Sequence, residues 1–161
     1  MIAELAVRRA RIPDLRRVSE FAGELVRLHH AVDPQRFFLP DRVEEGYASW
    51  LRRELRNKNA VVLVAERGEE LVGYAYGTLE PRNWNALLDE HGAIHDVFVA
   101  SASRRGGAGR MLVEALAREL EGLGAASIVL ATMVGNTAAQ ALFERCGFRP
   151  TMLEMTRSRG G

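Results

Sequence analysis

The residues best suited to chemistry form a basic, glycine-rich run, Arg104–Arg110, with the sequence RRGGAGR. This run lies between an apolar stretch, residues 94–99, and a helical pattern that opens at Met111. Glycine lets a backbone come close to a ligand, and a helix N-terminus carries partial positive charge that attracts anions. Arginine guanidinium groups donate paired hydrogen bonds to phosphate oxygens. A strand, a glycine-rich turn and a helix in this order therefore predict a phosphate-binding site.

Two familiar phosphate-binding motifs fit this run poorly. A P-loop requires Lys and then Ser or Thr after its last glycine, whereas Arg110 and Met111 follow Gly109. A dinucleotide-binding fingerprint requires a third glycine, and Leu112 stands at that position. The motif that remains has the form Arg-x-x-Gly-x-Gly. The alternative interpretation is a surface turn that begins a basic helix.

A second motif lies downstream of this loop. Residues 127–132 have the apolar character of a strand, and Asn136, Ala139 and Phe143 lie on the short helix that is expected to follow. Gly147 suits the left-handed conformation that ends such a helix. Two motifs in this order, separated by one helix and one strand, are far more specific than either motif alone.

Together the two motifs resemble the signatures of the GNAT N-acetyltransferase superfamily, whose acyl-CoA pyrophosphate loop has the form Arg/Gln-x-x-Gly-x-Gly/Ala. The similarity is strong over residues 94–148 and looser over the rest of the chain. It implies an α/β (α+β) fold in which helices flank a mixed, mostly antiparallel central sheet with splayed parallel strands. It also implies direct transfer of an acetyl group from acetyl-CoA to an amine. Dimerisation is common in this superfamily, so a homodimer is one expected state.

The resemblance also assigns the acetyl-CoA contacts. The loop would hold the pyrophosphate, and the strand before it would pair its backbone with the pantetheine amides. Asn136 would hydrogen-bond the pantetheine or the acceptor, or would act as an N-cap, a position that asparagine favours. The expected contact residues are Val97, Phe98, Val99, Arg104, Arg105, Gly106, Gly107, Ala108, Gly109, Arg110, Asn136 and Phe143.

The catalytic groups depart from the family pattern. Phe143 stands where many members carry a tyrosine that protonates the leaving thiolate, and Ala131 stands where some carry a glutamate base. The remaining polar pair is His95 and Asp96, which strand alternation places on opposite faces of the sheet. Histidine, with an unperturbed pKa of about 6.5, suits proton removal from an ammonium group, and Asp96 would attract a cationic amine. Both are candidate catalytic residues, and Tyr76 is a candidate proton donor or a packing residue.

Composition narrows the class of protein further. The chain has 161 residues, a formal net charge of +1 and one cysteine, Cys146. These values predict one domain over residues 1–156 and a disordered tail at 157–161, with no metal site and no bulk charge to recruit nucleic acid or membrane. An apolar run long enough to span a membrane and a signal-peptide core are both missing, so we expect a cytoplasmic protein.

The order of elements is predicted from hydrophobic periodicity and from turn residues. One strand is followed by two helices, three strands, a helix, a strand, a helix and a last strand. The strands are expected at residues 5–10, 60–66, 71–80, 93–99, 126–132 and 149–156, and the helices at 12–30, 42–56, 107–123 and 137–146.

The sequence thus predicts an acetyl-CoA-dependent N-acetyltransferase whose acceptor is a primary amine on a small molecule or a peptide. Two alternatives stay open at this point. One is a non-catalytic acyl-CoA-binding or regulatory module of the same fold, which the residues Phe143 and Ala131 motivate. The other is a binding protein for a different phosphorylated ligand.

Overall fold

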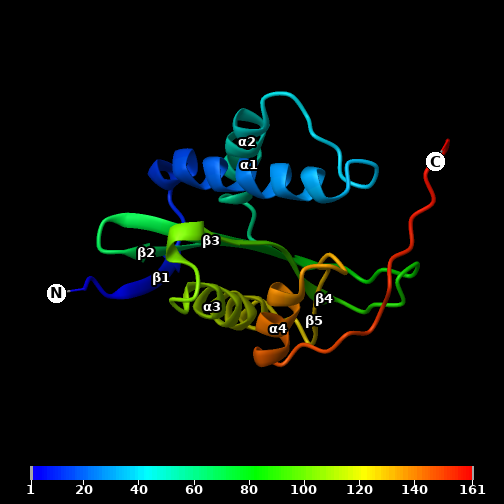
Figure 1. Cartoon of the computed structure of the whole chain (residues 1–161). Coiled ribbons are helices and arrows are strands. Elements are labelled where there is room, and N and C mark those ends of the chain that lie inside the picture. Colours follow the sequence, from blue (N-terminus) through cyan, green and yellow to red (C-terminus); the bar gives the residue numbers. More distant parts are fainter. Residues whose placement is uncertain (1, 161) are drawn as a thin grey trace.

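The computed structural model of the chain describes residues 2–160, and a five-stranded sheet lies at its centre between two layers of helices (Figure 1). Two short 3-10 helices, η1 and η2, precede α1 and α3. In chain order the elements are β1 (Leu5–Arg9), η1 (Ile12–Asp14), α1 (Leu15–Val32), α2 (Val43–Glu54), β2 (Ala60–Arg67), β3 (Glu70–Glu80), β4 (His91–Val99), η2 (Ser101–Ser103), α3 (Ala108–Gly122), β5 (Ile128–Leu130) and α4 (Thr137–Arg145).

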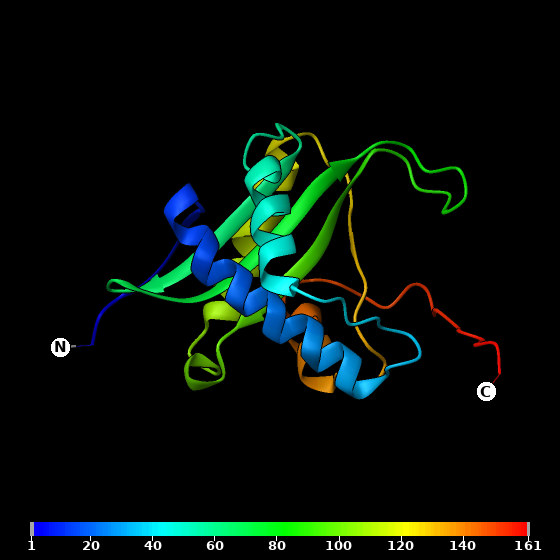
Figure 2. The ribbon, with the colours of Figure 1, turned by 90° about the horizontal axis from the view of Figure 1, so that it is seen from above.

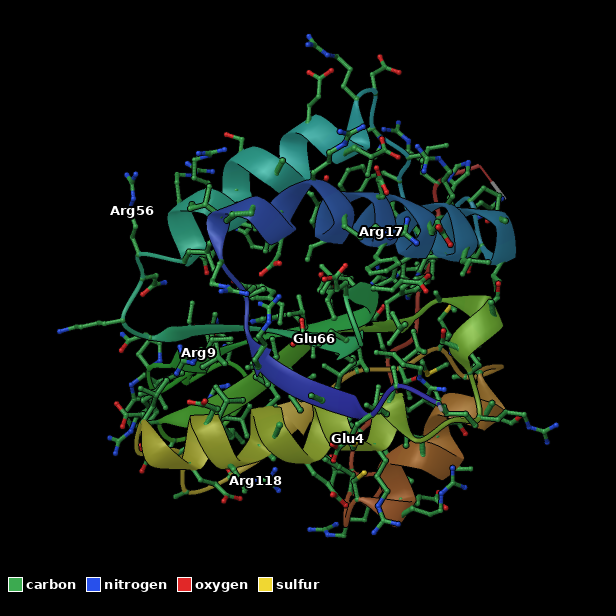
Figure 3. The ribbon with its side chains drawn as sticks, turned by 90° about the vertical axis from the view of Figure 1, so that its left-hand side faces the viewer. Glu4, Arg9, Arg17, Arg56, Glu66 and Arg118 are labelled. Carbon is green, nitrogen blue, oxygen red and sulfur yellow. The ribbon has the colours of Figure 1, made fainter. Side chains whose placement is uncertain are left out.

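Helices α1 and α2 cross over one face of the sheet, and α3 and α4 cover the other (Figures 1 and 2). Figure 3, which faces the β1 edge, shows the same layers, with Arg17 on the α1 side and Arg118 on the α3 side. Each layer buries an apolar helix face against the sheet, which is the main stabilising force of such a fold. Phe21 and Leu51 lie in the first core, and Leu112 and Leu116 lie in the second.

The sheet has the order β1-β2-β3-β4-β5, and its first four strands are antiparallel. Strand β5 runs parallel to β4 but pairs with it only from Gly92 to Ile94. Strand β5 ends at Leu130, opposite Ile94, so residues 95–99 of β4 have no paired strand on that side among the described residues. The predicted mixed sheet with splayed parallel strands is therefore confirmed.

Two sequence predictions near the C-terminus were wrong. Residues 149–156 do not form a strand, and β5 spans only Ile128–Leu130 rather than residues 126–132. A strand requires a neighbour for its N–H and C=O groups, and among the described residues no strand pairs with residues 149–156 or with the residues on either side of β5. Residues 149–156 instead run along the surface, where Glu154 forms an ion pair with Arg36. The expected disordered tail falls partly outside the described residues, because Gly161 is not among them.

Candidate active site

The predicted phosphate loop connects β4 to α3. Arg105 has φ 65° and Gly107 has φ 86°, so the backbone turns twice through the left-handed region. Gly107 caps α3, and the first hydrogen bond of the helix joins the Met111 N–H to the Gly107 carbonyl at 3.0 Å. The N–H groups of residues 108–110 precede this bond and have no acceptor within the helix. The N-terminus of α3 therefore offers backbone donors and partial positive charge at one point.

Each glycine of the loop is required for a different reason. A Cβ at Gly109 would lie 3.1 Å from Leu142 Cδ2, so this glycine lets α4 pack closely on α3. A Cβ at Gly106 would lie 3.0 Å from Nη2 of Arg67, the last residue of β2. At Gly107 a Cβ would meet nothing within 4 Å, so only its positive φ favours glycine.

Two of the three arginines of the loop form hydrogen bonds within the protein. Arg104 donates from Nε to the Val99 carbonyl at 3.1 Å, and Arg110 donates from Nε to Glu114 at 2.8 Å. Arg105 is exposed. The loop also lies against Arg67, whose buried Nε has no hydrogen-bond partner among the described residues. Sequence reasoning missed Arg67 because it is far from the loop along the chain, and no motif marks it.

The other predicted cofactor contacts lie on β4, at the N-cap of α4 and within α4. Val97, Phe98 and Val99 occupy the part of β4 that β5 does not pair. Asn136 caps α4, since its side chain accepts a hydrogen bond from the Ala139 N–H at 3.1 Å. Phe143 packs against the ring of Phe148, at 6.2 Å between ring centroids, within the α3 layer.

A β-bulge in β4 determines where the candidate catalytic pair points. Tyr76 pairs with Asp96 and the next residue, Gly77, pairs with Ile94, so His95 is the extra residue that has no partner on β3. The extra residue breaks the alternation of side chains along the strand. Asp96 accepts a hydrogen bond from the Tyr74 hydroxyl at 3.0 Å, while the His95 ring lies 5.2 Å from the Tyr76 ring.

Tyr74 and Tyr76 both pack in the core beneath α1 and α2, so His95 and Asp96 lie on the same face of the sheet. The prediction that alternation separates them was wrong, because the bulge shifts the register by one residue. The structure thus brings together the two candidates that sequence reasoning had separated.

Burial controls the acidities around Asp96. Burial raises the pKa of the Asp96 carboxyl, whereas the hydrogen bond from Tyr74 and the nearby His95 and His29 lower it, and the net direction is upward. Burial also raises the pKa of Tyr47 to about 12, with a smaller contribution from the Asp96 charge. A carboxyl in this environment is a stronger base than an exposed aspartate.

Helix α2 contributes residues that the sequence did not indicate. Tyr76 donates its hydroxyl proton to Glu54 at 2.5 Å, and burial followed by this hydrogen bond raises the Tyr76 pKa. Trp50 packs edge-on against the Tyr76 ring at 5.1 Å. The Tyr76 hydroxyl is therefore committed to a carboxylate and is a poor proton donor to a substrate.

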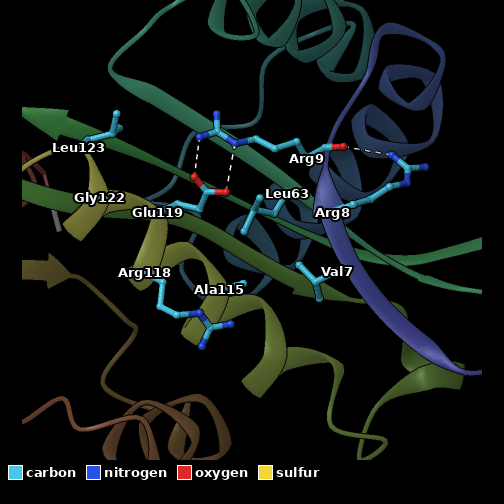
Figure 4. Close-up of a pocket in the computed structure, with 9 residues that line it drawn as sticks. All are labelled: Val7, Arg8, Arg9, Leu63, Ala115, Arg118, Glu119, Gly122 and Leu123. Atoms are coloured by element: carbon cyan, nitrogen blue, oxygen red, sulfur yellow. Dashed lines mark hydrogen bonds and ion pairs between the residues drawn. The ribbon is translucent and has the colours of Figure 1, made fainter.

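Two surface grooves flank the sheet. One, of about 530 Å³, lies beside His95 and is also lined by Glu80, His91 and Trp84. The other, of about 410 Å³, lies between β1 and α3 (Figure 4). The second groove is spanned by the ion pair of Arg9 with Glu119 at 2.6 Å. Of these two grooves, only the first adjoins a candidate catalytic residue, His95.

The fold agrees with the comparisons with known proteins. The Acetyltransferase (GNAT) family matches residues 25–148, which is most of the chain, and the chain belongs to this family. An uncharacterized N-acetyltransferase of Bacillus subtilis (strain 168), YhfO, is 30% identical over 105 residues, which cover 65% of this chain and 68% of the relative.

Several solved structures share the fold at low sequence identity. The BH1408 protein of Bacillus halodurans superposes with a TM-score of 0.81 at 19% identity, over 96% of this chain and 99% of that one. AAC(6')-Iy, in complex with a bisubstrate analogue of CoA and acetylneamine, gives a TM-score of 0.75 at 16% identity, over 98% and 99% of the two chains. Glucosamine-6-phosphate N-acetyltransferase of Arabidopsis thaliana gives 0.69 at 19% identity, over 96% and 97%.

Among residues 2–160, no group of three or more His, Cys, Asp or Glu side chains is arranged to hold a metal ion. In the same part of the chain, no helix has the length and apolar character that a membrane span requires.

Proposed function

We propose that this protein transfers the acetyl group of acetyl-CoA to a primary amine of a small molecule or peptide. One observation carries the proposal: the unpaired part of β4 leads directly from the polar pair His95 and Asp96 to the glycine-rich N-terminus of α3. A ligand that has a pyrophosphate at one end and a hydrogen-bonding arm at the other matches both features. Acetyl-CoA is such a molecule.

The expected position of acetyl-CoA follows from these features. Its pyrophosphate would accept hydrogen bonds from the N–H groups of residues 108–110, with Arg105 and Arg67 adding positive charge. Its pantetheine arm would extend along residues 97–99 and use the free backbone groups of β4, as an added strand would. This direction leads the thioester toward the bulge at His95.

The reaction then consists of proton transfers, the formation of one C–N bond and the cleavage of one C–S bond. A base takes a proton from the ammonium group, and the nitrogen lone pair attacks the acetyl carbonyl carbon. The new C–N bond forms, the C–S bond breaks, and CoA leaves as a thiolate that takes up a proton. His95 is the proposed base, and Asp96 attracts the cationic amine. Burial raises the pKa of the Cys146 thiol, which disfavours a covalent acetyl-cysteine route.

The residues around the groove indicate a cationic acceptor. Glu80 lines the groove and supplies a carboxylate, and the ring of Trp84 in the same lining can attract an ammonium group. The aminoglycoside and glucosamine-6-phosphate enzymes of the same fold are named for substrates that carry amines. We propose that the acceptor of this chain is likewise a small molecule that carries an amine, and we name no particular compound.

A thermal-shift titration with acetyl-CoA, CoA and ATP tests the proposal. Acetyl-CoA at a hundredfold excess over its Kd should stabilise the fold by about 2.7 kcal/mol, which is about 5–10 °C in Tm for a chain of this length. The shift should vanish in Gly107→Glu and persist in the matched control Gly46→Glu, which places the same charge on α2. A positive result is followed by an amine-library screen that detects released thiol.

A non-catalytic acyl-CoA-binding module is the second candidate function. The observation that favours it is the apolar Phe143, which packs against Phe148 and has no proton to give to the thiolate. Turnover of any amine above the uncatalysed rate excludes this candidate. A shift with ATP equal to that with CoA points instead to a different phosphorylated ligand.

The proposal also includes a cytoplasmic location and a homodimer. The exposed segment 149–156 and the open edge of β5 support the homodimer, because unpaired strand edges recruit further strands.

A further inference from the structure

A short chain of hydrogen bonds connects β3 to the bulge of β4. The Thr78 hydroxyl donates to Glu80 Oε1 at 2.5 Å, and the same hydroxyl oxygen lies 2.7 Å from His95 Nε2. His95 Nε2 also lies 3.8 Å from Glu80 Oε1. Thr78 is buried, with 6% of its surface exposed, so its hydroxyl has little access to water as an alternative partner.

The number of protons in this hydrogen-bond network determines the tautomer of His95. A hydroxyl carries one proton, and a carboxylate can only accept hydrogen bonds. Because the Thr78 proton is given to Glu80, the contact between Thr78 and His95 requires a proton on His95 Nε2. Neutral imidazole carries one N–H, so its other nitrogen, Nδ1, keeps the lone pair.

We propose that Glu80 and Thr78 are positioning residues that hold the proton of His95 on Nε2 and so leave Nδ1 as the proton acceptor in catalysis. The catalytic part of this inference rests on the proposed function. The tautomer itself depends only on the hydrogen bonds of the structure. His95 Nδ1 has no hydrogen-bond partner among the described residues, so it is available to a substrate or to a bridging water.

The surroundings of His95 suit a base that becomes a cation. When Nδ1 accepts a proton, the positive charge of the ring lies close to the Glu80 carboxylate and beside the face of Tyr76. Asp96, the next residue, adds a further negative group. The His95 side chain is 40% exposed, which leaves it within reach of an acceptor in the adjoining groove.

Nitrogen-15 NMR of the imidazole rings tests the tautomer without any substrate. Spectra are recorded at about pH 8.5, above the ordinary histidine pKa of about 6.5. The chain has four histidines, and His95→Asn identifies the signals of His95 by their loss. We expect the Nε2–H form alone, with a slowly exchanging Nε2 proton.

Three variants separate proton placement from simple packing. Thr78→Val removes the acceptor, so the Nε2 proton should exchange rapidly, and Thr78→Ser should restore its protection. Glu80→Ala frees the Thr78 proton to be donated to Nε2, so the Nδ1–H form should appear. Because Glu80 is partly exposed, this variant is expected to fold even if Thr78→Val does not.

Two NMR results overturn the inference. One is a dominant Nδ1–H form in the wild-type protein. The other is a tautomer that stays unchanged in Glu80→Ala.

Kinetics then test the catalytic part. With an amine that is turned over, Thr78→Val should lower kcat by about tenfold and leave the KM for acetyl-CoA unchanged. This loss is a fraction of the roughly 10²–10⁴-fold that general base catalysis contributes to the rate. An unchanged kcat overturns the role of Nδ1. Absence of turnover in the wild type, together with the expected tautomer, means that the proposed function has failed while the hydrogen-bond network stands.

Discussion

Replacing Gly107 by alanine isolates the backbone conformation of the phosphate loop. Gly107 has φ 86° and ψ −5°, and an added Cβ would meet no atom within 4 Å. The substitution therefore causes no collision, and its effect comes from the left-handed conformation. That conformation costs an L-residue about 1–2 kcal/mol, partly offset by about 0.4–1 kcal/mol because alanine restricts the unfolded chain. We expect a net loss of about 1 kcal/mol.

Gly46→Ala is the matched control. Gly46 lies inside α2, and an added Cβ would also meet nothing within 4 Å, but its φ is not positive. Alanine in a helix interior is about 0.5–1 kcal/mol more favourable than glycine, so this variant should be more stable than the wild type. The two variants make the same chemical change and are expected to shift the free energy of unfolding in opposite directions, with a difference of about 2 kcal/mol.

Urea denaturation measures the stabilities, and calorimetric titration measures acetyl-CoA binding. The Gly107 variant should lose about 2–4 °C in Tm and bind acetyl-CoA about tenfold more weakly, which is 1.4 kcal/mol, because the turn no longer aims its N–H groups at the phosphate. The Gly46 variant should bind normally. If both variants gain stability, the φ argument is wrong, and if both bind acetyl-CoA as the wild type does, the loop does not hold the pyrophosphate.

Three further predictions concern stability and assembly. Hydrogen bonds from Arg8 hold the Asp14 pKa below its usual value, so this carboxylate stabilises the fold above about pH 4 and loses that effect as the pH falls through its folded pKa. Asp14→Asn should cost about 2 kcal/mol at pH 7 and little at pH 2, as measured by urea denaturation. Burial raises the Asp96 pKa in the folded protein. The contribution of Asp96 to stability is therefore present below the pKa that it has in the unfolded chain, and it is lost as the pH rises through the folded-state pKa. Asp96→Asn should therefore be more stable than the wild type at pH 7, and a loss of stability there would contradict the burial argument. Met152 and Met155 are 91% and 87% exposed on the unpaired C-terminal segment, so light scattering should show a dimer that the double change of both residues to serine converts to monomer.

Much of the framework was evident from residues that are close together in the chain. The glycine-rich run, its flanking strand and helix, and the Asn136 motif identify the family, because each is a local pattern with a local physical cause. The periodicity of apolar residues predicts the helices and most strands, since burial of one face acts at every turn. The glycine-rich run accordingly lies between a strand, β4, and a helix, α3, as the sequence predicted.

The catalytic geometry depends on pairing between distant segments, and the sequence could not supply it. Whether His95 and Asp96 share a face is decided by one extra residue in the β3–β4 ladder, and a single-residue shift reverses every side chain beyond it. The partners Thr78 and Glu80 come within reach of His95 only through that pairing.

The same limit explains the two errors at the C-terminus and the omission of Arg67. A strand-like composition at 149–156 does not form a strand, because no other strand pairs with it among the described residues. Arg67 approaches the loop only because β2 ends beside it. The sequence by itself determined most of the elements, the family and the position of the glycine-rich run between a strand and a helix, because those depend on local patterns. The tertiary structure alone decided which polar groups meet, because strand register and helix packing join residues that are far apart in the chain.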